Sequence, residues 1–413
     1  MVMKLRDYQV DIANKGINIL KSKGIVYYAL EVRLGKTSVS LETARLFGAK
    51  RVLFLTKKKA ISSIESDYIN FEYDKHFELF VYNDESMHKI DGKFDLVIHD
   101  EHHRFGSFPK PSLGAKTYKK MFGHLPAIFL SGTPSPENYS QFYHQFWCSG
   151  YSPFKEVNFY KWAANYVNIK MKHLGYAQVK DYTDADINKI MIVIKPYVIT
   201  FTQEQANFTT SVNETILEVE MKPITYAIIK KLHKDLVVTS SKSGKTILAD
   251  TSVKLQQKTH QLFSGTIKYE DGTSQVIDDT KALFIANRFK DNKIAILYNF
   301  VAELEMLKSV LGDKLTTSLE EFNDSDKWYV GQIVSSREGI SLAAADYLVF
   351  INLQFSAVSF WQSRDRMSFL GRDKNQVFWI FAKNGIENSI YKTVLDKRDY
   401  TLNLFKKDFG IRK

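Results

Sequence analysis

One short stretch constrains the fold of this chain more than any other. Residues Ile25 to Leu30 are typical of a buried strand, Gly-Lys-Thr follows at 35–37, and Ser38 to Phe47 predict a helix. This order of strand, turn and helix is that of a phosphate-binding loop, in which glycine admits the phosphate, lysine meets its β/γ charge and threonine ligates Mg²⁺. The pattern is incomplete, because Leu30 stands where a second glycine is usual. An ordinary turn that caps a helix is therefore the alternative.

The composition limits the class of protein and the kind of partner. At 413 residues the chain is too long for one typical core, so we expect two domains. Cys148 is the only cysteine, which excludes internal disulfides and cysteine-built metal sites and favours a cytoplasmic setting. We find no secretory signal and no apolar run of roughly 18 residues, so no membrane partner is expected. The net charge of +11 favours nucleic acid, although an AT-rich genome would also enrich lysine.

A pair of acids follows another apolar run. Residues 94–99 (Phe-Asp-Leu-Val-Ile-His) indicate a strand, and Asp100 and Glu101 come directly after it. If this strand neighbours the one before the phosphate loop, one acid can hold Mg²⁺ and the next can polarise the attacking water. His102 and His103 invite a zinc site, but adjacent residues diverge on a strand or helix and no further ligands accompany them.

Strands recur in both halves of the chain. A strand over 127–130 ends at Ser-Gly-Thr-Pro (131–134), which either bridges a nucleotide site to a neighbouring surface or forms a simple turn. Residues 190–199 and 215–221 are also typical of strands. In the second half, strands over 293–298, 328–334 and 347–353 alternate with helices, which implies a second open parallel sheet. The Gly-Lys-Thr at 244–246 has no convincing strand before it, so we expect one nucleotide site in all.

An arginine-rich stretch near the C-terminus is the second strong constellation. Gln362, Asp365, Arg366 and Phe369 are spaced to share one helical face. A buried polar stripe needs a partner, and a γ-phosphate across a cleft supplies one, because an arginine there stabilises the charge of phosphoryl transfer. An exposed basic helix is the alternative.

In order along the chain, these motifs resemble those of superfamily 2 helicases, especially the chromatin-remodeller-like (switch/sucrose-nonfermenting type) DNA translocases in their compact phage and bacterial form. Residues 5–9 (Leu-Arg-Asp-Tyr-Gln) resemble the adenine-reading segment, 31–37 the first motif and 100–103 the Asp-Glu-x-His motif. Residues 131–134 resemble the coupling motif, 337–342 (Arg-Glu-Gly-Ile-Ser-Leu) the fifth and 362–366 (Gln-Ser-Arg-Asp-Arg) the sixth. A set of motifs in the family's order over nearly the whole chain is far more specific than any one of them.

The resemblance implies an α/β fold with two RecA-like lobes, each an open, mainly parallel sheet flanked by helices, and a nucleotide cleft between them. Residues 1–205 would be the ATP-binding lobe with an aromatic-rich helical extension, and residues 206–413 the helicase lobe. ATP and Mg²⁺ would be the cofactors. The resemblance also implies a role for each matching residue: Gln9 reads adenine, Gly35 and Lys36 bind phosphate, Thr37 and Asp100 hold Mg²⁺, Glu101 orients or deprotonates water, Ser131 and Thr133 couple the lobes, Gly339 lies near nucleotide and DNA, and Arg366 is an arginine finger.

Two positions depart from the family pattern. Arg33 stands where many relatives have glycine, so either the loop bends differently or Arg33 itself faces phosphate. The second arginine of the sixth motif falls at Phe369, so either Arg372 or Arg364 replaces it or turnover is weakened.

The expected function is that of a nucleic-acid-stimulated ATPase that acts as a DNA helicase or translocase, with duplex DNA as the expected partner. Phosphate contacts should dominate over base contacts, which makes binding tolerant of sequence and sensitive to salt. An RNA helicase is one alternative. A catalytically weak DNA-binding scaffold is another, because of Phe369. We expect a monomer in the cytoplasm, or in the host cytoplasm if a phage encodes the chain.

Overall fold

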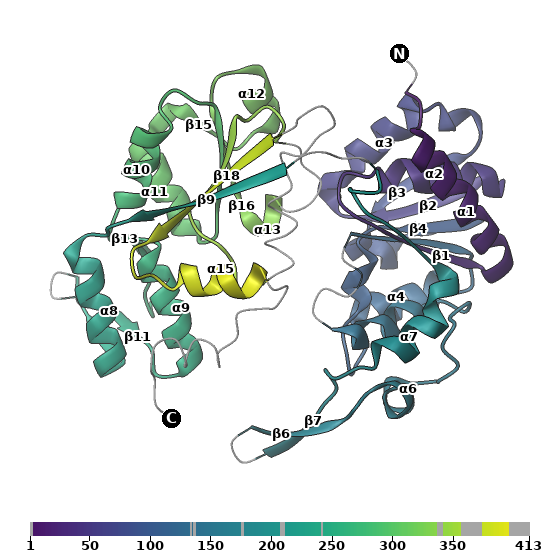
Figure 1. The fold of residues 1–413 in the computed structure, drawn as a ribbon, viewed down its shortest axis with the longest axis horizontal. Coiled ribbons are helices and arrows are strands. Elements are labelled where there is room, and N and C mark those ends of the chain that lie inside the picture. The colour runs from purple at the N-terminus through teal and green to yellow at the C-terminus, as the bar shows by residue number, and fades with distance from the viewer. Residues whose placement is uncertain are drawn as a thin grey trace. The chain divides into compact units, whose positions relative to one another are not determined.

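The chain folds into two compact units, residues 1–208 and 209–413. The computed structural model describes residues 3–132, 134, 138–174, 177–206, 211–240, 243–336, 342–356 and 374–395. Within these ranges each unit is built on one six-stranded sheet, and neighbouring strands of both sheets run parallel (Figure 1). Each unit is therefore an open parallel sheet with its own core.

The sheet of the first unit has the strand order β3-β2-β4-β5-β1-β8. Its strands are β1 (Ile25–Leu30), β2 (Arg51–Thr56), β3 (Glu78–Asn83), β4 (Leu96–His99), β5 (Ala127–Ser131) and β8 (Val198–Phe201). The strand before the glycine-lysine-threonine turn, β1, and the strand before the acids, β4, are not neighbours, because β5 pairs with both. Since all the strands are parallel, the three carboxyl ends still meet at one edge of the sheet.

Helices cover both faces of this sheet. Side chains alternate along each strand, so Val26 and Ile98 face one side while Tyr27 and Phe129 face the other. The first face packs against α1 (Asp7–Lys23), α2 (Lys36–Phe47) and α3 (Ile61–Asn70). The second packs against α4 (Leu113–Phe122), α5 (Phe142–Trp147), α6 (Phe159–Tyr166) and α7 (Ile187–Ile194).

The aromatic-rich segment that follows β5 is mainly core. Tyr143, Phe154, Phe159 and Trp162 are buried and contact one another edge-on or tilted. From this segment an antiparallel hairpin of β6 (Lys170–Leu174) and β7 (Ala177–Asp181) projects away from the helices (Figure 1). Core packing, rather than base stacking, thus accounts for these buried aromatic rings.

The strand predicted over 190–199 is wrong for most of its length. Residues Ile187–Ile194 form α7, and only Val198–Phe201 form a strand, β8. The side chain of Asp186 accepts a hydrogen bond from the backbone N–H of Lys189 and caps the helix. This cap and the packing of Ile190 and Ile194 in the core outweigh the strand preference of a run rich in isoleucine and valine.

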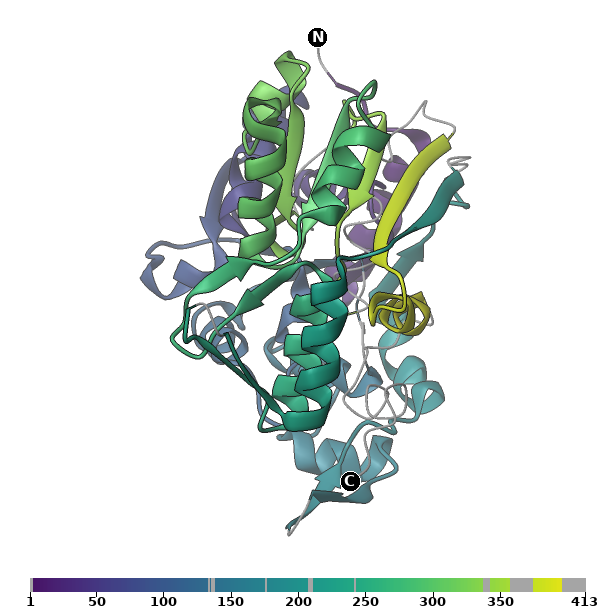
Figure 2. The same cartoon turned by 90° about the vertical axis from the view of Figure 1, so that its left-hand side faces the viewer.

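The sheet of the second unit has the order β15-β16-β14-β17-β18-β9. Its strands are β9 (Ser211–Val219), β14 (Ile294–Tyr298), β15 (Leu315–Thr316), β16 (Trp328–Gln332), β17 (Tyr347–Phe350) and β18 (Lys374–Ala382). α10 (Thr280–Arg288) and α11 (Val301–Leu311) pack on one face. The other face packs against α8 (Pro223–Asp235), α9 (Ser252–Phe263), α12 (Leu319–Asp324) and α15 (Glu387–Leu395), and Figure 2 shows helices of this group below the sheet. α13 (Ile333–Ser336) follows β16 directly.

Two hairpins interrupt the second unit: β10 (Val237–Thr239) with β11 (Thr246–Leu248), and β12 (Thr266–Lys268) with β13 (Ser274–Val276). The second Gly-Lys-Thr, at 244–246, leads into β11 and not into a helix. It therefore lacks the helix N-terminus of a phosphate loop.

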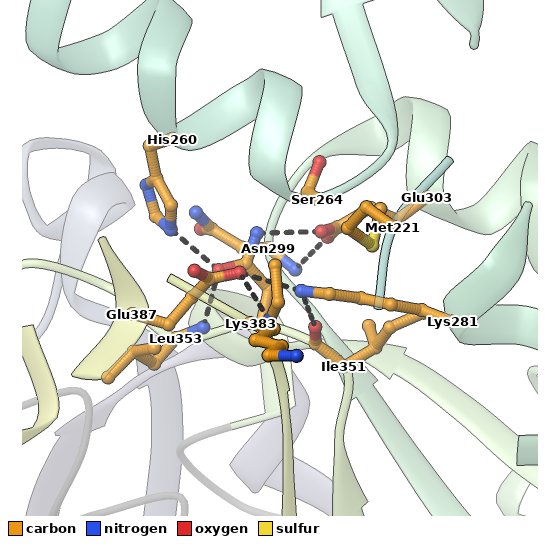
Figure 3. Close-up of polar contacts among 12 residues, drawn as sticks. Met221, His260, Ser264, Lys281, Asn299, Glu303, Ile351, Leu353, Lys383 and Glu387 are labelled. Carbon is orange, nitrogen blue, oxygen red and sulfur yellow. Dashed lines mark hydrogen bonds and ion pairs between the residues drawn. The ribbon is translucent and has the colours of Figure 1, made fainter. Parts of the chain in front are cut away.

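A buried polar cluster lies where β14, β17 and β18 end (Figure 3). Lys281 and Glu387 form an ion pair of 2.7 Å with neither side chain exposed, and Lys281 also donates to the backbone oxygen of Ile351. Asn352 accepts from His260 at 2.6 Å and donates to Glu303 at 2.7 Å. Buried charges are costly unless they are paired, so these contacts specify how α10, α11 and α15 meet the ends of the strands.

Candidate nucleotide site

The loop between β1 and α2 depends on glycine at position 35. Gly35 has a φ of 78°, in the left-handed region, and Lys36 is the first residue of α2. A Cβ at Gly35 would lie only 2.1 Å from Nε2 of Gln9. The left-handed backbone therefore favours glycine, and any larger residue would also have to displace the Gln9 amide. The start of α2 offers N–H groups and a positive dipole end to an anion.

Arg33 has a backbone conformation that suits glycine. Its φ of 67° lies in the left-handed region, which costs a residue with a Cβ about 1–2 kcal/mol. The loop thus has a glycine-like backbone at the position where the helicase pattern has glycine, although the residue is arginine.

Lys36 extends over the carboxyl edge of the sheet. Its Nζ donates to the backbone oxygen of Leu30 at 3.3 Å, and a Cβ built on Gly132, after β5, would lie 3.4 Å from it. The ammonium is also close enough to Asp100 to oppose the rise in the pKa of that carboxyl. Lys36 therefore lies at the edge between the ends of β1 and β4, where β5 ends. Thr37 is half-buried in the first turn of α2.

Asp100 and Glu101 form the turn after β4. Asp100 Oδ2 accepts from Oγ1 of Thr56 at 3.0 Å, and Oδ1 accepts from the backbone N–H of Glu101 at 2.9 Å. Burial, followed by the charge of Glu101, raises the pKa of Asp100 to about 7. A carboxylate that is held by two donors and is costly to ionise is a ready ligand for a divalent cation, which would favour its charged form.

Glu101, His103 and Ser131 are brought together by the strand order. Nδ1 of His103 lies 3.2 Å from Oε2 of Glu101 and 3.0 Å from Oγ of Ser131, the last residue of β5. Glu101 has a φ of 46°, so the chain turns sharply at this residue. The acid turn and the predicted coupling motif are therefore in direct contact within the first unit. Thr133 lies outside the described residues.

Gln9 is buried and links α1 to the phosphate loop. Its Oε1 accepts from the backbone N–H of Arg6 at 3.0 Å, and its Nε2 donates to the backbone oxygen of Leu34 at 3.1 Å. Tyr8 donates to the same oxygen at 3.3 Å. These contacts position the loop, and the reading of adenine stays a prediction.

The adjacent histidines diverge, as expected. His102 is fully buried, with its ring stacked on Phe129 at 3.6 Å, whereas His103 faces Glu101 and Ser131. Burial lowers the pKa of His102 to about 3, which keeps the ring neutral. Within the ranges that the structure covers, no group of three or more His, Cys, Asp or Glu side chains is arranged around a metal position.

Several predicted site residues fall outside the described ranges. These are Gly339, Arg364, Arg366, Phe369 and Arg372, together with most of both motifs that contain them. The predicted roles of the arginines and of Gly339 remain predictions from the sequence.

Thr56 is a site residue that the sequence motifs did not predict. Its hydroxyl is the side-chain donor to Asp100 Oδ2, across the β2–β4 pair. The available signal was its position, because a hydroxyl at the carboxyl end of a buried parallel strand lies on the ligand-binding edge.

No protein-family model and no curated protein sequence matches the chain. Among solved structures, the Pyrococcus furiosus Hef helicase domain is similar, with a TM-score of 0.51 and 15% identity over 95% of this chain and 99% of that one. The Sulfolobus solfataricus SWI2/SNF2 ATPase core in complex with dsDNA matches with a TM-score of 0.43 and 14% identity, over 99% of this chain and 94% of that one. The likeness to the Hef domain confirms the predicted fold class of two RecA-like lobes.

Proposed function

We propose that this chain, which has the fold of a superfamily 2 helicase core, is an ATP-dependent nucleic-acid motor that moves along duplex DNA. The observation that carries the proposal is the meeting of Lys36, Asp100 and Glu101 at one edge of a parallel sheet in a helicase fold. The first unit would be the ATP-binding lobe with its aromatic-rich extension, and the second the helicase lobe.

The residues at this edge fit ATP and Mg²⁺. Gly35 precedes the N–H groups at the start of α2, Lys36 carries the charge for the β- and γ-phosphates, and Asp100 is an oxygen ligand of the hard type that Mg²⁺ prefers. Mg²⁺ held by Thr37 and Asp100 would neutralise charge on the β- and γ-phosphates. Gln9 and Tyr8 support the loop from α1.

Glu101 is the proposed general base. Its carboxylate lies beside that of Asp100 in the turn, and its Oε2 lies 3.2 Å from Nδ1 of His103, the contact that would hold its orientation. It would orient the attacking water and take its proton. Ser131 contacts the same histidine, so a shift at the end of β5 would reach the base directly. Arg366, with Arg372 in place of the arginine missing at Phe369, would stabilise the transition state from the second lobe.

A nucleic-acid-stimulated ATPase assay tests this function. Steady-state ATP hydrolysis should rise when duplex DNA is added, and the rise should fall as salt increases. A larger response to duplex RNA would favour the RNA helicase instead. Turnover that responds to neither polynucleotide would leave the weak scaffold, which the sequence at Phe369 favours.

Two substitutions test the assigned residues. Lys36→Ala and Glu101→Gln should each lower kcat by about 10²–10⁴-fold without changing the melting temperature by more than a few degrees, because one removes phosphate charge and the other the base. Glu65→Gln, an exposed carboxylate on α3, is the matched control and should have the parent rate. Near-normal turnover in Lys36→Ala or Glu101→Gln would refute the assigned role.

A further inference from the structure

A buried glutamine in α5 has hydrogen bonds at both ends of its amide. Gln145 is fully buried, and its Nε2 donates to the backbone oxygens of Pro134 at 2.7 Å and Gln141 at 3.1 Å. Its Oε1 accepts from the hydroxyl of Tyr27 at 2.7 Å. Because both amide protons and the amide oxygen are used, only one orientation of the amide satisfies the site.

Tyr27 continues these contacts toward the nucleotide site. It lies on β1, fully buried, with its hydroxyl hydrogen-bonded to Gln145 and close enough to the Ser131 hydroxyl for that group to oppose the rise in the pKa of Tyr27. Ser131 contacts Nδ1 of His103 at 3.0 Å, and the same nitrogen lies 3.2 Å from Oε2 of Glu101. Gln145, Tyr27, Ser131, His103 and Glu101 thus form a continuous series of contacts, hereafter the buried polar chain.

The hydrogens of the buried polar chain can be assigned. The amide oxygen of Gln145 can only accept, so Tyr27 donates to it. The oxygen of Tyr27 is then left to accept from the neighbouring hydroxyl of Ser131. Nδ1 of His103 must carry a proton, because a lone pair there would face the Glu101 carboxylate. That single proton can be donated to Oγ of Ser131 or to Oε2 of Glu101, so no two lone pairs and no two protons need to face each other along the chain.

α5 also holds the acid turn by a second route. The backbone oxygen of Gln145 accepts from Nε2 of His102 at 2.7 Å, and the His102 ring stacks on Phe129 of β5. The same residue therefore contacts the turn that contains Glu101, through His102, and the segment after Ser131, through Pro134. Gln145 thus links the Asp-Glu-x-His turn and the Ser-Gly-Thr-Pro segment to each other and to α5.

We propose that Gln145 is a positioning residue for ATP hydrolysis, which through Tyr27 and Ser131 holds His103 and the Glu101 carboxylate in their catalytic arrangement. The proposal rests on the proposed function. Since α5 lies near the start of the aromatic-rich extension, residues 138–197, that extension is joined to the base through the buried polar chain, beyond its role as core. A ligand that displaces α5 would therefore change kcat for ATP hydrolysis more than it changes the affinity for nucleotide.

The test is Tyr27→Phe, which removes one hydroxyl from the chain and keeps the ring. It should lower kcat about 5- to 30-fold, as expected for a lost hydrogen bond in a charged network, with KM for ATP unchanged within about 2-fold. The Kd for ADP, measured by calorimetry, should also be unchanged, because no phosphate contact is touched.

Tyr118→Phe is the matched control. Tyr118 on α4 is fully buried in the same core, and its hydroxyl has no hydrogen-bond partner among the described residues. It should leave kcat and KM unchanged. Equal kcat values for Tyr27→Phe and Tyr118→Phe would overturn the proposal, as would a rise in KM with kcat intact.

A double-mutant cycle separates positioning from a general loss of stability. In the Ser131→Ala background the chain is already cut, so adding Tyr27→Phe should lower kcat by less than 2-fold. Full additivity would overturn the proposal. If Tyr27→Phe fails to fold, judged by circular dichroism against Tyr118→Phe, the same cycle is run with Gln145→Met and the same criterion applies. Near-normal turnover in Glu101→Gln would instead refute the role of Glu101 as base, and failure of the proposed function itself would appear separately, as ATP hydrolysis in the parent protein that no polynucleotide stimulates.

Discussion

The hydroxyl of Thr56 orients one carboxylate oxygen of Asp100, Oδ2, at the carboxyl edge of the first sheet. The other oxygen, Oδ1, accepts from the backbone N–H of Glu101. Groups that orient a metal ligand commonly contribute 10–100-fold to metal affinity. Thr56→Val should therefore raise the Mg²⁺ concentration for half-maximal ATPase activity about 10-fold, measured by Mg²⁺ titration at saturating ATP. Thr56→Ser keeps the hydroxyl and should titrate as the parent does; a matching shift in Thr56→Ser would argue against this role.

Arg33 permits a test of backbone strain that does not depend on its side-chain contacts. Arg33→Gly and Arg33→Ala both remove the side chain, but only alanine keeps a Cβ at a φ of 67°. The glycine variant should therefore be more stable than the alanine variant by about 1 kcal/mol, read as a higher melting temperature. An alanine variant that melts at the higher temperature would show that the left-handed conformation is not strained.

At the scale of elements, the ion pair between Lys281 of α10 and Glu387 of α15 is the sharpest test of the second unit. Lys281→Met alone removes the cation from a buried carboxylate and the side-chain donor from a buried carbonyl, and should lower the free energy of unfolding by about 3–5 kcal/mol. Combining it with Glu387→Leu removes the stranded charge. The double variant should regain much of the lost free energy of unfolding. Urea denaturation of the purified proteins measures this recovery.

The exposed ion pair of Lys327 and Glu321 is the control for this comparison. Both side chains are more than a third exposed, so Lys327→Met should change the urea midpoint little. If the double variant at Lys281 and Glu387 were less stable than Lys281→Met, the pair would not be the source of the effect.

The sequence predicted elements well where a local pattern decides them. The expected strand over 25–30 coincides with β1, the strand over 127–130 lacks only the last residue of β5, and the strand over 293–298 begins one residue before β14. The predicted strand over 190–199 was wrong, because the Asp186 cap and burial of the helix's apolar side chains stabilise a helix there. Lys36, Asp100 and Glu101 follow from residue type and position, whereas Gln145 and Tyr27 do not, because 118 residues separate them and only the fold makes them neighbours.

At the scale of the whole molecule, each unit contains histidines that are neutral because they are buried. Burial lowers the pKa of His102 and of His260 to about 3, against about 6.5 in an unfolded chain. The folded state therefore binds fewer protons, so stability is complete above pH 6.5 and falls as the pH drops toward 3. Each such histidine adds up to about 1.4 kcal/mol of loss per pH unit in that window.

The melting temperature of His260→Gln tests this account. The variant keeps a side-chain donor for Asn352 but cannot titrate, so its melting temperature should fall less than the parent's between pH 7 and pH 5. The exposed His76→Gln should follow the parent curve. Identical pH dependence in His260→Gln and the parent would show that this ring does not govern acid sensitivity.

Among the helices that the structure describes, none has the length and apolar character that a bilayer crossing demands.

The amide of Gln145 also limits where the proton of the attacking water can go. An amide oxygen is a very weak base, and both N–H groups of Gln145 already point at carbonyls. The inner end of the buried polar chain therefore cannot accept a proton, and Nδ1 of His103 already carries one, which faces Ser131 and Glu101. A proton taken up by Glu101 must leave outward, with the products or to solvent. The interior orients the base but offers no exit for its proton.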